Sequence, residues 1–189
     1  MSNRNRRIPQ GKKMKPTFFV FCEGKTEELY VKYLKSKYRI PFEIDTQISK
    51  SRISEKYIKA YKKTKFTHPK DKTFLLYDID VPTMLKRLQE ISQTTLLASN
   101  PCIELWFLLH YKNQTANVDC RYCIQELKNR NKTYSKTVLD IRLKTHFDNN
   151  LKKAESRAKK LKHYDNPSTT VYLLIKELEK LSEESKYKA

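Results

Sequence analysis

Short apolar segments alternate with amphipathic segments along residues 17–112 of the chain. The apolar segments have the length of strands and lie at 17–23, 42–48, 72–80 and 94–99. The segments between them carry apolar residues three or four positions apart, which is typical of helices. This alternation predicts an α/β domain in which a mostly parallel sheet is flanked by helices.

The remainder of the chain differs in character from this domain. Residues 113–189 show no strand pattern and predict a basic helical C-terminal extension packed on the domain. Residues 1–16 carry six basic side chains and no acidic one, and predict a disordered basic arm. We therefore expect one α/β domain at 17–112 between an arm and an extension.

Residues that favour helix starts precede three of the expected helices. Thr26 is expected to cap the helix after the first strand, and Asn100 to cap a helix that begins at Pro101. The segment 166–168, Asn-Pro-Ser, is expected to form a turn and cap before the last helix.

The formal net charge of +19 predicts that the surface attracts a polyanion, and nucleic acid is the leading candidate. A highly charged protein with no such partner, or one that binds a membrane surface, would have a similar composition. The side chains expected to bind phosphate are Lys25, Lys152, Lys153, Arg157, Lys159, Lys160 and Lys162. The alternative for the segment 150–164 is a solvated helical face.

Apolar runs and cysteines limit the possible location of the protein. No run reaches the roughly 18 apolar residues of a membrane span, and the N-terminus lacks the apolar core of a secretory signal. The four cysteines are too few for a disulfide scaffold, so a cytoplasmic protein is expected. Cys120 and Cys123 form a C-x-x-C pair, but no second pair follows, which favours helical packing over zinc; His110 would join them only if the fold brought it close.

Acidic residues follow the first and third predicted strands. Glu23 and Glu27 flank Gly24, a glycine placed where the chain must turn tightly or admit a close approach. Asp78 and Asp80 end the third strand, on one side of it. Because ligands bind beyond the carboxyl ends of parallel strands, we expect these carboxylates to converge on Mg²⁺ or Mn²⁺. Ordinary strand-end and turn acids are the alternative.

Two motifs, "EGKTEELY" and "YDID", resemble the Toprim pattern of a glutamate on one strand and an acidic D-x-D on a later strand. "SNPCIELWFLLHY" at 99–111 and "NPST" at 166–169 extend the likeness. Together they resemble the RloB-like (AbiLii-like) proteins, a Toprim branch associated with phage defence and abortive infection. The resemblance covers residues 16–181.

The resemblance implies a Mg²⁺-dependent Toprim nuclease. It implies that Glu23, Asp78 and Asp80 bind the metal, and that Glu27 matches a second glutamate of the nucleases of the overcoming-lysogenisation-defect kind. It further implies that Glu104 faces the same site. Some Toprim nucleases place a lysine after the acidic strand; here Lys86 and Arg87 are the nearest basic residues, inside a predicted helix.

The same resemblance implies partners. A controlling ATPase encoded alongside is expected. RNA such as tRNA is slightly favoured over DNA as the substrate. Whether the chain forms a homo-oligomer is left open. The competing interpretation is a non-catalytic nucleic-acid-binding or regulatory subunit that retains the fold.

Overall fold

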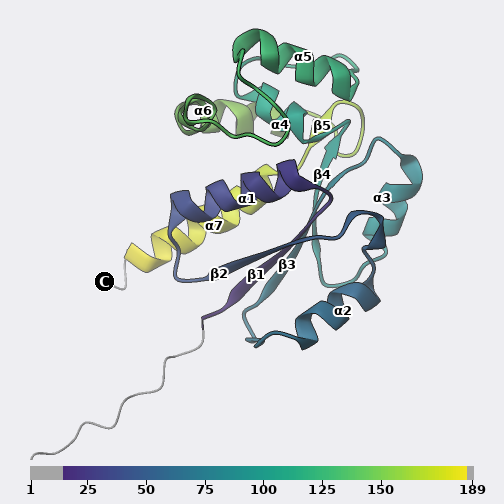
Figure 1. The fold of residues 1–189 in the computed structure, drawn as a ribbon, viewed down its shortest axis with the longest axis vertical. Helices are drawn as coiled ribbons and strands as arrows, with labels where there is room; N and C mark the ends of the chain where they lie inside the picture. Colours follow the sequence, from purple (N-terminus) through teal and green to yellow (C-terminus); the bar gives the residue numbers. More distant parts are fainter. Residues whose placement is uncertain (1–14, 187–189) are drawn as a thin grey trace, which may run out of the picture.

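The computed structural model describes residues 15–186, which form a sheet flanked by helices (Figure 1). The strands are β1 (Thr17–Cys22), β2 (Glu43–Ile48), β3 (Lys72–Asp78), β4 (Thr95–Asn100) and β5 (Ser168–Thr169). Their order in the sheet is β2-β1-β3-β4-β5, with β1 to β4 parallel and β5 antiparallel to β4. The predicted α/β class with a mostly parallel sheet is confirmed.

Helices cover both faces of this sheet. They are α1 (Lys25–Tyr38), α2 (Glu55–Lys63), α3 (Pro82–Gln89), α4 (Ile103–Leu109), α5 (Cys120–Arg130), α6 (Ile141–Lys159) and α7 (Tyr172–Lys186). Figure 1 shows α1 and α7 side by side along one face, α2 and α3 on the other, and α4 to α6 gathered at one end of the molecule. In the described part of the chain, no helix is both long enough and apolar enough to cross a membrane.

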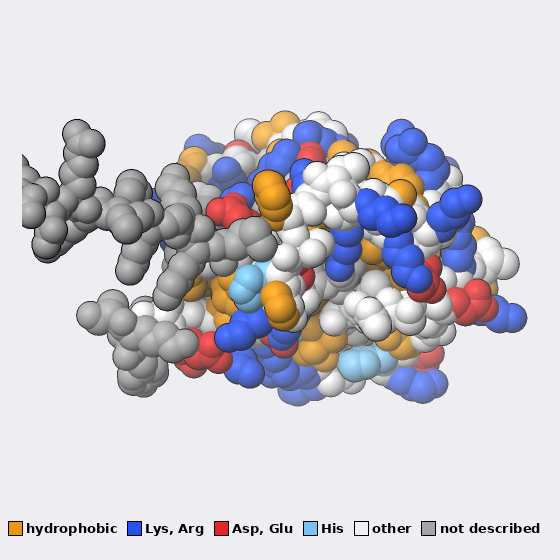
Figure 2. Space-filling model, turned by 90° about the horizontal axis from the view of Figure 1, so that it is seen from below, with side chains coloured by type: hydrophobic (Ala, Val, Ile, Leu, Met, Phe, Trp, Pro, Cys, Tyr) orange, Lys and Arg blue, Asp and Glu red, His pale blue; other side chains and the backbone are white. Residues whose placement is uncertain are grey.

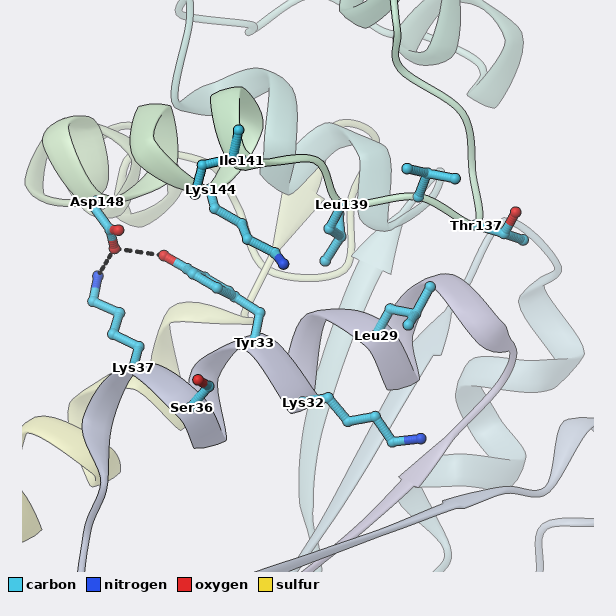
Figure 3. A pocket seen from close by; sticks show the side chains of 11 residues that line it. Leu29, Lys32, Tyr33, Ser36, Lys37, Thr137, Leu139, Ile141, Lys144 and Asp148 are labelled. Carbon is cyan, nitrogen blue, oxygen red and sulfur yellow. Dashed lines mark hydrogen bonds and ion pairs between the residues drawn. The ribbon is translucent and has the colours of Figure 1, made fainter.

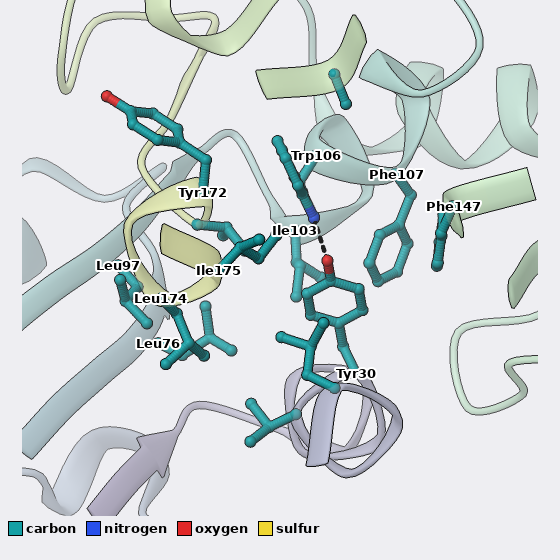
Figure 4. Packing of buried hydrophobic residues seen from close by; sticks show 14 of the residues in the cluster. Tyr30, Leu76, Leu97, Ile103, Trp106, Phe107, Phe147, Tyr172, Leu174 and Ile175 are labelled. Atoms are coloured by element: carbon teal, nitrogen blue, oxygen red, sulfur yellow. Dashed lines mark hydrogen bonds between the residues drawn. The ribbon is translucent and has the colours of Figure 1, made fainter. Parts of the chain in front are cut away.

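Alternating side chains of the strands build two cores. Phe18 and Val20 of β1 point toward α1 and α7, whereas Phe19 and Phe21 point toward α2 and α3. The α1 side is the larger core, because α4, α5 and α6 also contribute to it. At its centre the Trp106 indole N–H donates a hydrogen bond of 2.7 Å to the Tyr30 hydroxyl (Figure 4).

A short strand near the C-terminus was not expected. The segment 166–168 does not cap a helix, because Ser168 and Thr169 pair with Asn100 and Ser99 of β4. The hydroxyls of Ser99 and Thr169 are also hydrogen-bonded, at 2.9 Å. This pairing covers an edge of β4 that would otherwise be open, and α7 begins only at Tyr172.

The two other predicted helix starts are also wrong. Gly24, not Thr26, is the N-cap of α1, and the Thr26 hydroxyl instead donates to the carbonyl of Lys136. Asn100 belongs to β4, and α4 begins at Ile103 after a Cys102 N-cap. The cause in both cases is tertiary pairing, which uses the capping side chain elsewhere or prolongs a strand.

Parts of the predicted terminal segments lie outside the described residues. These are residues 1–14 of the basic arm and residues 187–189 of the C-terminal extension. Within the described extension, α6 runs unbroken from Ile141 to Lys159.

Candidate functional site

The ends of the adjacent strands β1 and β3 bring two predicted carboxylates together. Glu23 directly follows β1, and Asp78 is the last residue of β3. The Glu23 carboxylate accepts a hydrogen bond of 2.9 Å from the Asp78 backbone N–H. The Asp78 carboxylate in turn accepts one of 2.9 Å from the Ile103 N–H at the start of α4. The expectation that parallel strand ends place these residues side by side is therefore met.

Glu27 lies in the first turn of α1 and is only 6% exposed. Its Oε2 accepts a hydrogen bond of 2.9 Å from the Gly24 N–H. Gly24 has φ −142° and ψ −165°, an extended backbone that does not require glycine. A Cβ at this position would lie 3.1 Å from Glu27 Oε2, so the glycine leaves room for the carboxylate.

Burial and mutual repulsion act on these carboxyl groups. Burial raises the pKa of Glu23, and the charge of Asp80 adds to the effect. Burial likewise raises the pKa of Glu27, with additions from Glu104 and Glu23. The pKa of Asp78 is raised well above its usual range by burial and then by Glu27, Glu23 and Glu104. Neighbouring negative charges therefore add to the effect of burial on Glu23, Glu27 and Asp78, and a cation among these carboxylates would relieve the repulsion.

We call Glu23, Glu27, Asp78 and Asp80 the acidic cluster. Among the described residues, no basic side chain forms an ion pair within 4.0 Å of any member of it. Glu28, in the same helical turn as Glu27, behaves differently: its carboxylate pairs with Lys25 at 2.6 Å and with Lys32 at 2.9 Å. Other described acids, such as Asp119 and Asp140, also lack an ion pair, but the acidic cluster gathers unpaired carboxylates at neighbouring strand ends of a chain with net charge +19.

The other two predicted acids are placed differently. Asp80 lies beyond the end of β3 and is exposed. Glu104 is 1% exposed, and its Oε1 accepts a hydrogen bond of 3.1 Å from the Tyr134 hydroxyl. The Lys136 ammonium lies 3.8 Å from the same oxygen. Glu104 therefore contacts the loop between α5 and α6, while its charge still reaches Asp78.

Most of the predicted phosphate-binding side chains already have partners. The contacts are Lys25 with Glu28, Lys152 with Glu155 and Glu179, Lys159 with Glu155, Lys162 with Asp165, and Arg157 with the Leu109 carbonyl. Lys153 and Lys160 form no ion pair with any described acid. Figure 2 shows the opposite end of the molecule from α6, where Lys and Arg side chains are scattered among a few acids.

Lys136 is a basic residue near the acids that the sequence did not single out. Its Nζ lies 3.6 Å from Cys120 Sγ, in addition to its contact with Glu104. The hydrogen bond from Thr26 to its backbone carbonyl fixes this part of the loop next to the start of α1. The loop between α5 and α6 has no apolar periodicity, so no sequence pattern reveals that it passes next to Glu104 and the start of α1.

A hollow of about 590 Å³ lies next to this region, between α1 and the start of α6 (Figure 3). Asp148 contacts both the Tyr33 hydroxyl and Lys37 at its wall. No member of the acidic cluster lines the hollow, so it is separate from the candidate metal centre.

Comparison with protein families finds a match over most of the described chain. The model of the RloB-like protein family matches residues 18–178, which includes the acidic cluster, α4 and the first part of α7. The chain belongs to the RloB-like protein family. No curated protein and no solved structure matches it. The matched range contains the strand-end acids and the motifs at 99–111 and 166–169.

Proposed function

We propose that this RloB-like chain is a Toprim-type, metal-dependent nuclease that hydrolyses phosphodiester bonds of nucleic acid in anti-phage defence. The observation that carries the proposal is the acidic cluster. Its carboxylates have no basic partner among the described side chains although the chain is strongly basic. Such a concentration of negative charge is stable when a cation shares it.

The donor set suits Mg²⁺ or Mn²⁺, because it consists of carboxylate oxygens on adjacent strand ends. Glu23, Asp78 and Asp80 would hold the ion, with Glu27 beside them. When bound, such an ion supplies a Lewis acid that polarises a phosphodiester and stabilises its leaving oxygen.

The chain's own residues orient this site and handle protons. The backbone N–H groups of Asp78 and Ile103 hold the carboxylates of Glu23 and Asp78 in fixed positions. Burial raises the pKa of Glu27, which makes its carboxyl group a candidate to accept or donate a proton in the reaction. Among the predicted phosphate-binding residues, Lys153 of α6 and Lys160 at its C-cap form no ion pair with a described acid, and their ammonium groups would bind phosphate.

The substrate and the control of the enzyme follow from the family resemblance. RNA such as tRNA is favoured over DNA, and an ATPase partner is proposed to restrain the nuclease. The competing function is a non-catalytic nucleic-acid-binding or regulatory subunit. One observation favours it: the carboxylates of Glu23, Glu27 and Asp78 all accept backbone hydrogen bonds, which would also be useful to the fold alone.

Cleavage of total RNA, tRNA and plasmid DNA with Mg²⁺ or Mn²⁺ tests the proposal. We expect Glu23→Gln and Asp78→Asn to lower the cleavage rate by at least about a hundredfold. The matched control is Glu28→Gln, because Glu28 lies in the same turn as Glu27 but is already paired with lysines. It should cleave as the wild type does.

The same variants separate the two functions. Equal cleavage by wild type and by Asp78→Asn would contradict a metal centre at the acidic cluster. The alternative outcome is that neither the wild type nor the variants cleave any substrate, even with the ATPase partner present, although all of them bind nucleic acid equally well. That outcome would favour the binding-subunit function.

A further inference from the structure

Two cysteines and a glutamate from separate helices meet beside the acidic cluster. The ligand atoms of Cys102, Glu104 and Cys120 all lie within 4.8 Å of one another. In the part of the chain that the structure describes, this is the one group of at least three Cys, His, Asp or Glu side chains that is so close. We call it the thiol cluster.

The fold brings further ligands to Cys120, which the sequence did not place at the spacing of a zinc site. Cys120 belongs to a C-x-x-C pair without a second pair at suitable spacing. The turn into α4 brings Cys102 and Glu104 against the start of α5, where Cys120 is the first helical residue. The donors are thus assembled from two helices, as in many zinc sites.

The surroundings of the thiol cluster resemble those of a preorganised metal-binding site. Cys102 and Glu104 are each 1% exposed, whereas Cys120 is partly exposed and gives access from solvent. The Tyr134 hydroxyl donates to Glu104 Oε1 and so orients the carboxylate, the role that partners of metal ligands play. Glu104 Oε2 lies 3.9 Å from Cys120 Sγ. Two such ligands of one tetrahedral zinc ion are about 3.5 Å apart, so only a small movement is required.

We propose that Cys102, Glu104 and Cys120 bind a zinc ion. Thiolates are soft ligands that select zinc over Mg²⁺, and three protein ligands leave a fourth position open. This inference is independent of the proposed nuclease function, because none of its donors belongs to the acidic cluster.

Lys136 occupies the position of a competing cation. Its ammonium lies 3.6 Å from Cys120 Sγ and 3.8 Å from Glu104 Oε1, while half of its side chain is exposed. The ammonium would therefore move toward solvent when the ion binds. Its removal should favour zinc, since two cations would no longer repel each other.

A zinc ion would also fix the first turn of α4. Ile103 lies between two of the ligands, and its N–H is the donor to the Asp78 carboxylate. The ion would thereby hold the helix end against which a member of the acidic cluster is aligned.

The metal content of the full-length protein tests the proposal. We expect equimolar zinc in wild type after gel filtration, and loss of it in Cys102→Ser and Cys120→Ser. Cys22→Ser is the control, because Cys22 is a buried cysteine of β1 outside the thiol cluster. Cys120 is partly exposed, so its variant should fold even if Cys102→Ser does not. Wild type without zinc, or Cys120→Ser with full zinc, would overturn the proposal.

Two further measurements sharpen this test. Cobalt added to metal-free protein should give a thiolate charge-transfer band in wild type and none in Cys120→Ser. Lys136→Met should bind zinc roughly tenfold more tightly than wild type; weaker or equal binding would overturn the placement of the ion beside that ammonium. Asp78→Asn should keep its zinc, so a failure of the nuclease proposal is distinguishable from a failure of this one.

Discussion

Gly24 matters for the space it leaves and not for its backbone conformation. Its φ of −142° suits alanine, but an added Cβ would approach Glu27 Oε2 to 3.1 Å. Because that oxygen ends a flexible side chain, we expect Gly24→Ala to change the free energy of unfolding by less than about 1 kcal/mol. Displacement of the carboxylate should lower metal-dependent cleavage by about tenfold or more. Urea unfolding and cleavage assays on one preparation check both values, and unchanged cleavage would mean that the position of Glu27 is unimportant.

His110 should make the fold sensitive to acid. Its Nδ1 lies 2.9 Å from the Trp106 carbonyl and must donate to it, while Nε2 is buried without a partner among the described residues. Burial lowers its pKa from 6.5 to about 3. Below pH 6.5 the His110 imidazole is therefore protonated in the unfolded chain but stays neutral in the folded chain. The free energy of unfolding consequently falls as the pH drops toward 3.

Replacement of His110 isolates this effect from the general acid sensitivity of a basic protein. The loss is about 1.4 kcal/mol per pH unit, or about 2 kcal/mol between pH 6.5 and pH 5. We expect His110→Phe, which keeps an aromatic ring beside Phe147, to lose about 2 kcal/mol less than wild type between pH 7 and pH 5. Urea titrations at the two pH values give the difference, and parallel losses would refute the assignment.

At the scale of elements, the start of α6 anchors the loop that carries Lys136. The Asp140 carboxylate caps α6 through a hydrogen bond of 2.7 Å from the Leu143 N–H, and it also accepts from Thr133 and Asn131. Asp119 caps α5 through a single hydrogen bond of 2.7 Å from the Tyr122 N–H.

These two caps form a matched pair for mutation. A lost cap costs about 1 kcal/mol, and Asp140→Ala also removes the contacts within the loop. We expect Asp140→Ala to lower the free energy of unfolding by about 2 kcal/mol and Asp119→Ala by about 1 kcal/mol. Thermal and urea unfolding check the order, and equal losses would mean that the loop contacts add nothing.

The elements also show which features the sequence reveals. β1 and β3 are continuous apolar runs, so their ends, with Glu23 and Asp78, were predictable from parallel-sheet geometry. β5 has two residues and exists only because β4 offers an edge, which no local pattern records. The meeting of Cys120 with Cys102 and Glu104 depends on how the segment between α4 and α5 turns back, and no periodic pattern records that turn, so the thiol cluster could not be foreseen.

At the scale of the whole molecule, the charge of +19 predicts salt-sensitive binding of nucleic acid. The affinity for a single-stranded nucleic acid decreases with salt, and the magnitude of the slope of log affinity against log salt should decrease by about 0.7 for each phosphate contact removed. We expect this loss in a Lys153→Gln, Lys160→Gln double variant. The control is Lys152→Gln with Lys159→Gln, which removes the same charge from lysines already paired with acids. Equal slopes in the two double variants would exclude a specific role for Lys153 and Lys160.

The last part of the chain completes structures that the first part begins. β5 pairs with the edge of β4, and Leu174, Ile175 and Leu178 of α7 are buried in the core beside α1. During translation this edge and this core stay uncovered until residues 168–178 leave the ribosome. We expect a nascent chain halted at residue 165 to be cleaved readily by protease, and the released chain to resist. Synthesis itself would then delay the moment at which the sheet that carries the acidic cluster becomes rigid, and a ribosome that stops early would release a chain whose β4 edge and α1 core stay uncovered.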